Sequence, residues 1–189
     1  MLVYNSTYQL IGKEINTLID KMKKQDFDAI YDLMEKSFPI EEYRTYEEQK
    51  ELLHNPVYSI YVLYNESQEI KAFIAVWEFE EFAFIEHFAV NPEHRNSGIG
   101  AYMLNELVEQ LGKTICLEVE PPETEMARRR IGFYQRNNFY LNEYPYIQPS
   151  ISQGKKPIPL ILMTSCSKVD EDRFNRIKGT LYKKVYKCM

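Results

Sequence analysis

The most constraining feature of this sequence is the segment 88–104, in which an apolar strand passes through a polar turn into an amphipathic helix. Gly98 and Gly100 occupy the turn, where glycine permits a positive φ and a close approach of the backbone to a ligand. The first turn of a helix offers unpaired N–H groups and the positive end of the helix dipole. Arg95 adds a guanidinium group that can hydrogen-bond phosphate oxygens. The segment therefore predicts an anion cradle that suits a pyrophosphate.

Two common nucleotide-binding motifs do not fit this turn. A P-loop needs a glycine, four residues, and then Gly-Lys followed by Ser or Thr. A dinucleotide fingerprint needs a third glycine at fixed spacing and an acidic residue about 20 positions later. The turn instead has the spacing Arg-x-x-Gly-x-Gly. It therefore predicts a phosphate carrier outside these two classes of nucleotide site.

The order of apolar patterns along the chain predicts one mixed α/β core. With 189 residues and 44% hydrophobic residues, the chain is long enough for one well-buried core and short for two. The patterns predict strands at 15–22, 57–64, 70–79, 82–90, 114–119, 139–141 and 158–163, and helices at 27–37, 45–54, 99–111, 124–137 and 170–187. Asp26 is the expected cap of the first helix, and Gly112 ends the third. Periodicity alone indicates an α+β or α/β domain.

The glycine turn and a second segment together resemble one protein family. The spacing Arg-x-x-Gly-x-Gly after a strand ending in Val90-Asn91-Pro92 resembles the acetyl-coenzyme A motif of the GNAT N-acetyltransferases. The segment 127–139 resembles that family's Ala-x-x-Phe-Tyr-x-Lys/Arg-x-Gly-Phe pattern. Asn138 stands where the family usually has glycine, and asparagine is the other residue that best accepts a left-handed conformation at a helix end. The resemblance implies the acyl-coenzyme A N-acyltransferase fold, with a mixed sheet whose central strands splay apart to admit acetyl-coenzyme A, the donor of the acetyl group.

The residue pattern and the resemblance together divide the chain into three parts. Residues 1–14 are expected to form a loosely packed leader, and 15–166 the N-acetyltransferase domain. Residues 167–189 carry apolar positions at three- and four-residue steps, which predict an extra C-terminal amphipathic helix. Packing of this helix on the domain is the favoured interpretation, and a dimer contact is the alternative.

Charge and composition exclude several classes of function. A formal charge of −5 with a pI near 5.4 argues against nucleic-acid binding. The three cysteines and three histidines show no metal-ligand spacing, so no metal is expected. The odd number of cysteines, with no charged-then-apolar signal segment and no bilayer-length apolar segment, predicts a cytoplasmic protein that does not enter membranes. A monomer and a homodimer both remain open.

Two residues are the catalytic candidates. By resemblance, Tyr134 lies beside the sulfur of the donor and protonates the departing thiolate, although an aromatic packed into the core is the alternative. The acceptor amine must lose a proton before it attacks, and Glu86 is the first candidate for the base. Phe84 and Phe88 lie two residues away on the same nominal face and predict an apolar setting, unless a bulge moves Glu86 to the other face. His87 and an ordered water are the alternatives to Glu86.

The donor site implied by the resemblance extends along the same strand and turn. The backbone of Phe88, Ala89 and Val90 is expected to pair with the pantetheine arm as an added strand. The pyrophosphate is expected to contact the turn residues Arg95, Asn96, Ser97, Gly98, Ile99, Gly100 and Ala101. Cys116 has a strand position typical of the core and is not needed as a nucleophile.

The resemblance therefore implies transfer of an acetyl group from acetyl-coenzyme A to a primary amine by direct attack. The acceptor is a small molecule or a peptide whose identity the residues leave open, as they do the length of the acyl chain. By family analogy, the connection 38–44 and the loop 142–156 flank the acceptor pocket. The alternative function is a catalytically silent module that binds acyl-coenzyme A and senses it or regulates a partner.

Overall fold

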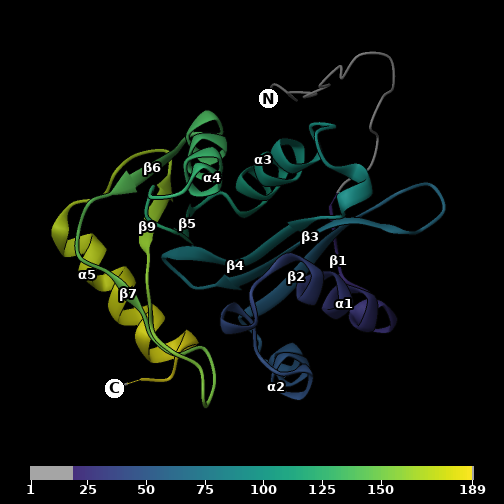
Figure 1. The fold of residues 1–189 in the computed structure, drawn as a ribbon, viewed down its shortest axis with the longest axis horizontal. Coiled ribbons are helices and arrows are strands. Elements are labelled where there is room, and N and C mark those ends of the chain that lie inside the picture. Colours follow the sequence, from purple (N-terminus) through teal and green to yellow (C-terminus); the bar gives the residue numbers. More distant parts are fainter. Residues whose placement is uncertain (1–18, 189) are drawn as a thin grey trace.

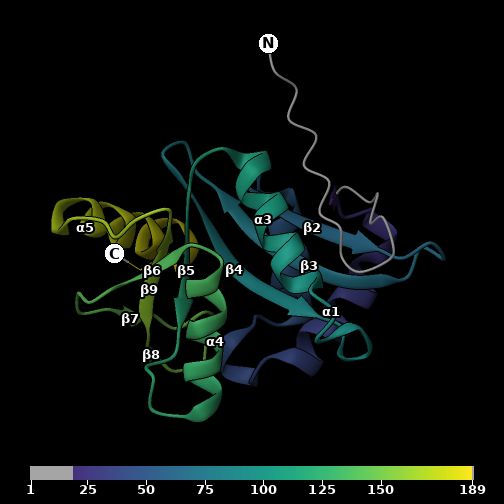
Figure 2. The ribbon, with the colours of Figure 1, turned by 90° about the horizontal axis from the view of Figure 1, so that it is seen from above.

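The chain folds around a mixed sheet that is covered by helices on both faces. The computed structural model describes residues 19–188, so the expected leader at 1–14 lies outside them. The main sheet has seven strands in the order β1-β2-β3-β4-β5-β9-β6, and β7 and β8 form a separate two-stranded ribbon. Helices α3 and α4 lie above the sheet in Figure 1, and α1 and α2 lie below it. Figure 2 shows α3 and α4 side by side across the face nearest the viewer.

The strands follow the predicted order, except that β7 was not predicted and one predicted strand divides into β8 and β9. They are β1 (Asp20–Lys21), β2 (Tyr58–Tyr64), β3 (Ile70–Glu78), β4 (Phe82–Val90), β5 (Thr114–Val119), β6 (Phe139–Asn142), β7 (Ile147–Gln148), β8 (Ile158–Pro159) and β9 (Ile161–Ser165). Of the predicted first strand at 15–22, residues 15–18 lie outside the described residues, and β1 covers Asp20–Lys21. The predicted strand at 158–163 is wrong in its bounds, because Ile158 and Pro159 pair with β7 and the sheet strand runs over Ile161–Ser165.

Capping interactions mark the ends of some of the helices. They are α1 (Phe27–Ser37), α2 (Tyr46–Glu51), α3 (Ile99–Leu111), α4 (Glu125–Arg136) and α5 (Glu171–Thr180). Thr45 and Glu48 form a reciprocal capping box at the start of α2. Asp26 does not cap α1 with its side chain, because a 3₁₀ turn precedes the helix and the Asp26 carboxylate accepts a hydrogen bond from Tyr64. Gly112 ends α3 with φ of 58°, as predicted.

The final helix continues beyond α5 as a π turn. The predicted helix at 170–187 is α-helical over Glu171–Thr180 and becomes a π-helical turn at Leu181–Val185. Phe174, Ile177 and Leu181 are buried in the same core cluster as residues of α1 and α2. Among the described residues, no helix is both long and apolar enough to cross a bilayer.

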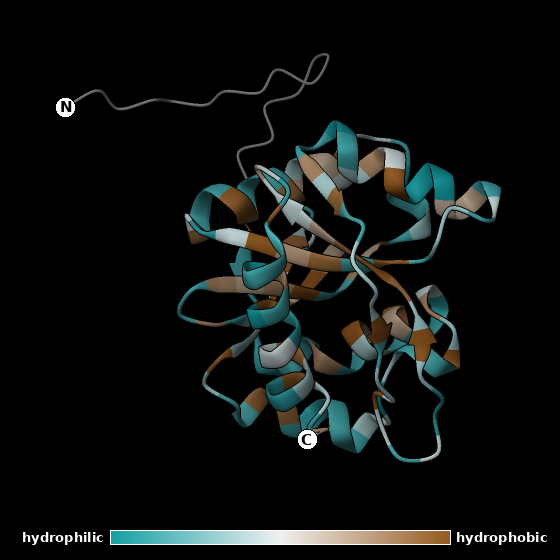
Figure 3. Ribbon diagram, turned by 90° about the vertical axis from the view of Figure 1, so that its left-hand side faces the viewer, coloured by the Kyte–Doolittle hydropathy of each residue, from teal (hydrophilic) through white to brown (hydrophobic). Residues whose placement is uncertain are grey.

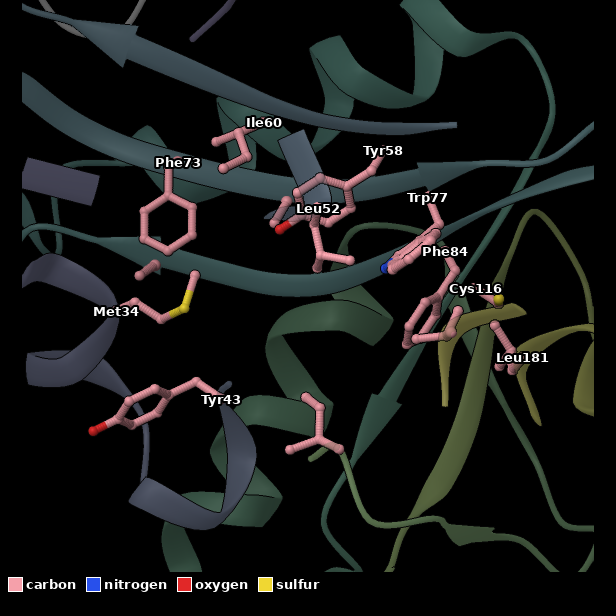
Figure 4. Close-up of a cluster of buried hydrophobic side chains, with 14 of the residues drawn as sticks. Met34, Tyr43, Leu52, Tyr58, Ile60, Phe73, Trp77, Phe84, Cys116 and Leu181 are labelled. Carbon is pink, nitrogen blue, oxygen red and sulfur yellow. The ribbon is translucent and has the colours of Figure 1, made fainter. Parts of the chain in front are cut away.

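Two cores lie on opposite faces of the sheet. One packs α1, α2 and α5 against residues such as Phe73 and Trp77, and Figure 4 shows part of this cluster with Met34 and Leu181. The other packs α3 and α4 against strand residues such as Ile74. Figure 3 shows apolar residues concentrated along the central strands, while the helices carry many polar ones. Side chains along each strand alternate between these two cores, and a shift by one residue would exchange them, so this alternation fixes the register of the sheet.

β4 contains a β-bulge at Glu86. The register between β3 and β4 slips between Ala75 and Val76, and Glu86 is left without a partner residue on β3. The extra residue reverses which face the following side chains occupy. Phe84 accordingly packs in the core with α1, whereas Phe88 packs against the core with α3. The expectation that these two phenylalanines share one face is therefore wrong.

β4 and β5 separate immediately after this point. They pair in parallel only over Phe82–Ile85 and Thr114–Leu117. Residues 87–90 of β4 remain paired with β3 on one side, and residues 86–90 have no ladder partner on the β5 side. The central strands are thus splayed, as the resemblance implies, and the gap opens toward the start of α3 (Figure 1).

Candidate active site

A cavity of about 850 Å³ occupies the splay between β4 and β5. It extends from the turn before α3, past α4, to the residue that follows the π turn. Eleven of the twelve predicted site residues line it: Glu86, Phe88, Ala89, Val90, Arg95, Asn96, Gly98, Ile99, Gly100, Ala101 and Tyr134. Ser97 is not among the lining residues, and its hydroxyl group donates to the carbonyl of His94. The fold therefore brings nearly all the predicted residues to one cavity.

The glycine turn has the backbone geometry of an anion cradle. Asn96 and Gly98 have φ values of 60° and 81°. Gly98 is the N-cap of α3, and no side chain caps the helix there. A Cβ atom at Gly100 would lie 3.4 Å from the ring of Phe133 and 3.6 Å from the side chain of Val90, so Gly100 packs closely against the floor of the turn. The first N–H groups of α3 are therefore left for another hydrogen-bond acceptor.

The open edge of β4 leads from this turn into the cavity. Phe88, Ala89 and Val90 lie on the part of the strand that has no partner on the β5 side. The Val90 carbonyl accepts a hydrogen bond from Arg95 Nε at 3.1 Å, which ties the turn to the strand. The other backbone groups along this edge offer the pattern that an extended ligand can join as an added strand.

Tyr134 lies on α4 beside the open edge. Its side chain is 8% exposed and lies between the rings of Phe133 and Phe139, with centroids at 5.2 and 5.8 Å. Burial raises the pKa of Tyr134 to about 12, although the charge of Arg130 lowers it. The phenol therefore stays protonated at neutral pH and can donate a proton. Asn138 ends this segment with φ of 61°, which is the left-handed conformation predicted from sequence.

Glu86 forms a buried ion pair with Arg44. Arg44 Nη1 donates to Glu86 Oε1 at 2.8 Å, and the two side chains are 6% and 2% exposed. Arg44 Nη2 also donates to the carbonyl of Val185 at 3.3 Å. Burial opposes the charge of the guanidinium, but Glu86 outweighs this effect and raises the pKa of Arg44. Glu86 thus has a charged partner instead of the expected apolar setting, and its exposed surface comes from its main chain.

His87 points to the same side of the sheet and is fully enclosed. Its Nε2 lies 2.9 Å from the carbonyl oxygen of Glu42, and its ring meets Phe38 edge to face at 4.9 Å between centroids. Burial lowers the pKa of His87, although Glu86 works in the opposite direction. The neutral ring donates its Nε2 proton to that carbonyl. Nδ1 then lies 3.6 Å from Glu86 Oε2, and neither atom has a hydrogen-bond partner.

A second carboxylate, which the sequence analysis missed, lies at the splay. Glu118 follows the last residue of β5 that pairs with β4, and it lines the cavity. The hydroxyl of Tyr186 donates to Glu118 Oε2 at 2.7 Å, and the hydroxyl of Tyr146 donates to Oε1. Burial raises the pKa of Glu118 to about 7, with the charges of Glu86 and Glu42 adding to the effect and the two tyrosines opposing it. In the sequence, Glu118 stands out only as the one charged residue in a largely apolar strand, which is an unusual position for a glutamate.

The segments predicted to flank the acceptor pocket also reach the cavity. Phe38 and Glu42 come from the connection at 38–44, and Gln148 and Ile151 come from the loop at 142–156. Burial raises the pKa of the Glu42 carboxyl, which Arg130 partly offsets. This end of the cavity therefore combines aromatic and carboxylate groups.

Cys116 lies in the core, as predicted. Its side chain is 0% exposed, and burial raises the pKa of its thiol well above the usual value. Among residues 19–188, no group of three or more His, Cys, Asp or Glu side chains is arranged to hold a metal ion.

Comparison with known proteins places this geometry in context. The model of the acetyltransferase (GNAT) family matches residues 27–139. The Bacillus subtilis protein YjbC, which is classed as an acetyltransferase, is 28% identical over 111 residues. That alignment covers 58% of this chain and 55% of YjbC, so the match spans about half of the relative's length.

Solved structures share the fold over most of the chain. A Bacteroides thetaiotaomicron protein classed in the GNAT family is 35% identical with a TM-score of 0.81, and the alignment covers 90% of this chain and 99% of that one. The ribosomal-protein-S18-alanine N-acetyltransferase of Escherichia coli is 21% identical with a TM-score of 0.58. That second alignment covers 82% of this chain and 97% of the other, and at this identity the likeness concerns the fold alone.

Proposed function

Because this chain belongs to the GNAT family of acetyltransferases, we propose that it transfers an acetyl group from acetyl-coenzyme A to a primary amine by direct attack. The observation that carries the proposal is the single cavity that joins the glycine turn to a buried tyrosine and two carboxylates. Amine acceptors are also named for one of the solved relatives, which acetylates an alanine of a ribosomal protein.

The residues on the donor side fit coenzyme A. Gly98 and the uncapped start of α3 offer N–H groups to a pyrophosphate, and Arg95 lies at the mouth of the same turn. The open edge of Phe88, Ala89 and Val90 supplies backbone groups for the pantetheine amides. When bound, the thioester supplies an activated acetyl group, so the acetyl group needs no covalent attachment to the protein.

The residues at the splay fit the proton transfers that amide formation requires. Tyr134 is protonated at neutral pH, and we assign it the proton that the departing thiolate takes up. Glu86 and Glu118 both lie where the strands separate, and one of these two carboxylates accepts the ammonium proton of the acceptor. The unpaired N–H groups of β4 polarise the acetyl oxygen as it becomes negative.

The decisive experiment measures release of coenzyme A thiol. Purified protein is first heated with and without acetyl-coenzyme A to record the melting shift. It is then assayed with acetyl-coenzyme A and a panel of small amines, amino acids, and peptides with free N-termini or lysines. Tyr134→Phe is assayed in parallel. We expect turnover with one class of amine, and a fall in kcat of roughly 100-fold in the variant.

The possible outcomes separate the candidate functions. A melting shift with no turnover across the panel contradicts catalysis and supports the acyl-coenzyme A sensor. The absence of any melting shift contradicts coenzyme A binding and with it both functions. Turnover that Tyr134→Phe leaves unchanged contradicts only the role of Tyr134.

A further inference from the structure

The two carboxylates at the splay lie in different surroundings. Glu86 and Glu118 each follow the last residue pair of the β4–β5 ladder, which joins Ile85 to Leu117. The Glu86 side chain is 2% exposed and its Oε1 accepts from the charged Arg44. Glu118 is partly buried, and the two described groups that donate to it are neutral phenols. Glu86 is thus already paired with a cation of the protein, whereas Glu118 has no such cation among the described residues and can pair with a positive charge that enters the cavity.

The phenols that hold Glu118 come from outside the segment that matches the family model, which ends at residue 139. Tyr146 belongs to the loop that follows β6, and Tyr186 follows the π turn. The same π turn is anchored on Arg44 through the Val185 carbonyl. π turns frequently occur at functional sites, because the extra residue redirects the side chains that follow. Here the turn places a hydroxyl on a carboxylate 68 residues away.

We propose that Glu118 is the group that takes the proton from the acceptor ammonium, and that Tyr146 and Tyr186 are positioning residues that hold its carboxylate toward the acceptor. This proposal rests on the proposed acetyl transfer and names the base within it. The C-terminal segment is then part of the catalytic site as well as of the core.

The protons balance in this scheme. One proton passes from the ammonium group to a carboxylate oxygen of Glu118, which leaves a neutral amine. A nitrogen–carbon bond then forms at the acetyl carbonyl, and the carbon–sulfur bond breaks. The thiolate takes a proton from Tyr134, and the second proton lost by the nitrogen restores the phenol. Glu118 returns its proton to water, so one proton is released for each amide formed.

The pKa of Glu118 suits a group that accepts a proton near neutral pH. Burial raises its pKa to about 7, so near neutral pH a substantial fraction is ionised and ready to accept a proton. Removing a phenol donor destabilises the ionised form and moves the pKa further upward. The titratable groups that interact with Glu118 from the surrounding elements are Glu42, Glu86, Cys116, Tyr146, Tyr182 and Tyr186.

The test is the pH profile of kcat/KM with the amine found active in the thiol-release assay. Glu118→Gln is expected to lower kcat/KM at least roughly 100-fold and to remove the acidic limb. Tyr186→Phe is expected to move that limb to higher pH, with a roughly three- to tenfold loss at pH 6.5 that shrinks at pH 8.5. Tyr182→Phe is the matched control, because its hydroxyl donates to the Ile147 carbonyl from the same π turn. It should leave the limb in place.

Glu86→Gln discriminates between the two carboxylates. We expect it to lower the melting temperature but to keep the acidic limb, because its carboxylate holds Arg44. Loss of the limb in Glu86→Gln with retention in Glu118→Gln overturns the assignment. An equal effect of Tyr186→Phe and Tyr182→Phe overturns the positioning role. If wild-type protein that binds acetyl-coenzyme A acetylates none of the amines, the proposed function itself fails, and the assignment with it.

Discussion

The buried ion pair between Arg44 and Glu86 should dominate the stability of the region around the site. Replacing Arg44 with Met keeps most of the side-chain volume but leaves the Glu86 carboxylate in a position that is only 2% exposed, without its cation. Removing one partner of such a pair costs about 3–5 kcal/mol, against a typical domain stability of about 5–15 kcal/mol.

Urea unfolding followed by circular dichroism gives the free energy of unfolding of each variant. Arg44→Met should lose about 3–5 kcal/mol at pH 7, and adding Glu86→Gln should restore at least about 1 kcal/mol. Arg129→Met is the matched control, because its pair with Glu125 at 2.7 Å is 80% and 73% exposed. That control should cost less than about 1 kcal/mol. A cost below about 1 kcal/mol for Arg44→Met, or a double variant less stable than it, would refute the reasoning.

Two further changes test the glycine turn and the C-terminal segment. Gly98→Ala and Gly112→Ala place a side chain at φ values of 81° and 58°. Each should therefore lower the free energy of unfolding by about 1–2 kcal/mol. Only Gly98→Ala should reduce the melting shift with acetyl-coenzyme A. An equal reduction in both variants would argue against the cradle. Leu181→Ala empties a position that is 0% exposed at the start of the π turn and should cost about 2–5 kcal/mol. A loss below about 1 kcal/mol would show that the turn is not packed on the core in solution.

Local chemistry explains what could be predicted from the sequence. The left-handed φ values of Gly98, Gly112 and Asn138 follow from the residue types at helix ends. The apolar stripe of the last helix was equally visible, because helical spacing is a local property. Except for Ser97, the predicted donor residues at 88–101 gather at one cavity because they lie on one continuous strand, turn and helix.

The remaining features depend on contacts between distant residues. Arg44 and Glu86 are 42 positions apart, and Glu118 and Tyr186 are 68 apart, so no local pattern joins them. Pro159 interrupts an apolar run that resembled one strand, and the run divides between the ribbon and the main sheet. The roles of Glu86 and Tyr134 stay predictions until the kinetics are measured.

Because of the bulge at Glu86, side chains at even-numbered positions lie on one face of the sheet before the bulge and on the opposite face after it. Before it, even-numbered residues such as Phe84 face the core of α1, and after it the odd-numbered Ala89 does so. Phe88 and Val90 then turn toward α3. Deleting one residue here would invert the second half of the strand while leaving the first half in frame. The number of residues in β4 is therefore constrained more tightly than the identity of the residue at the bulge. Sequence alignments of β4 must be made separately for the residues before and after the bulge.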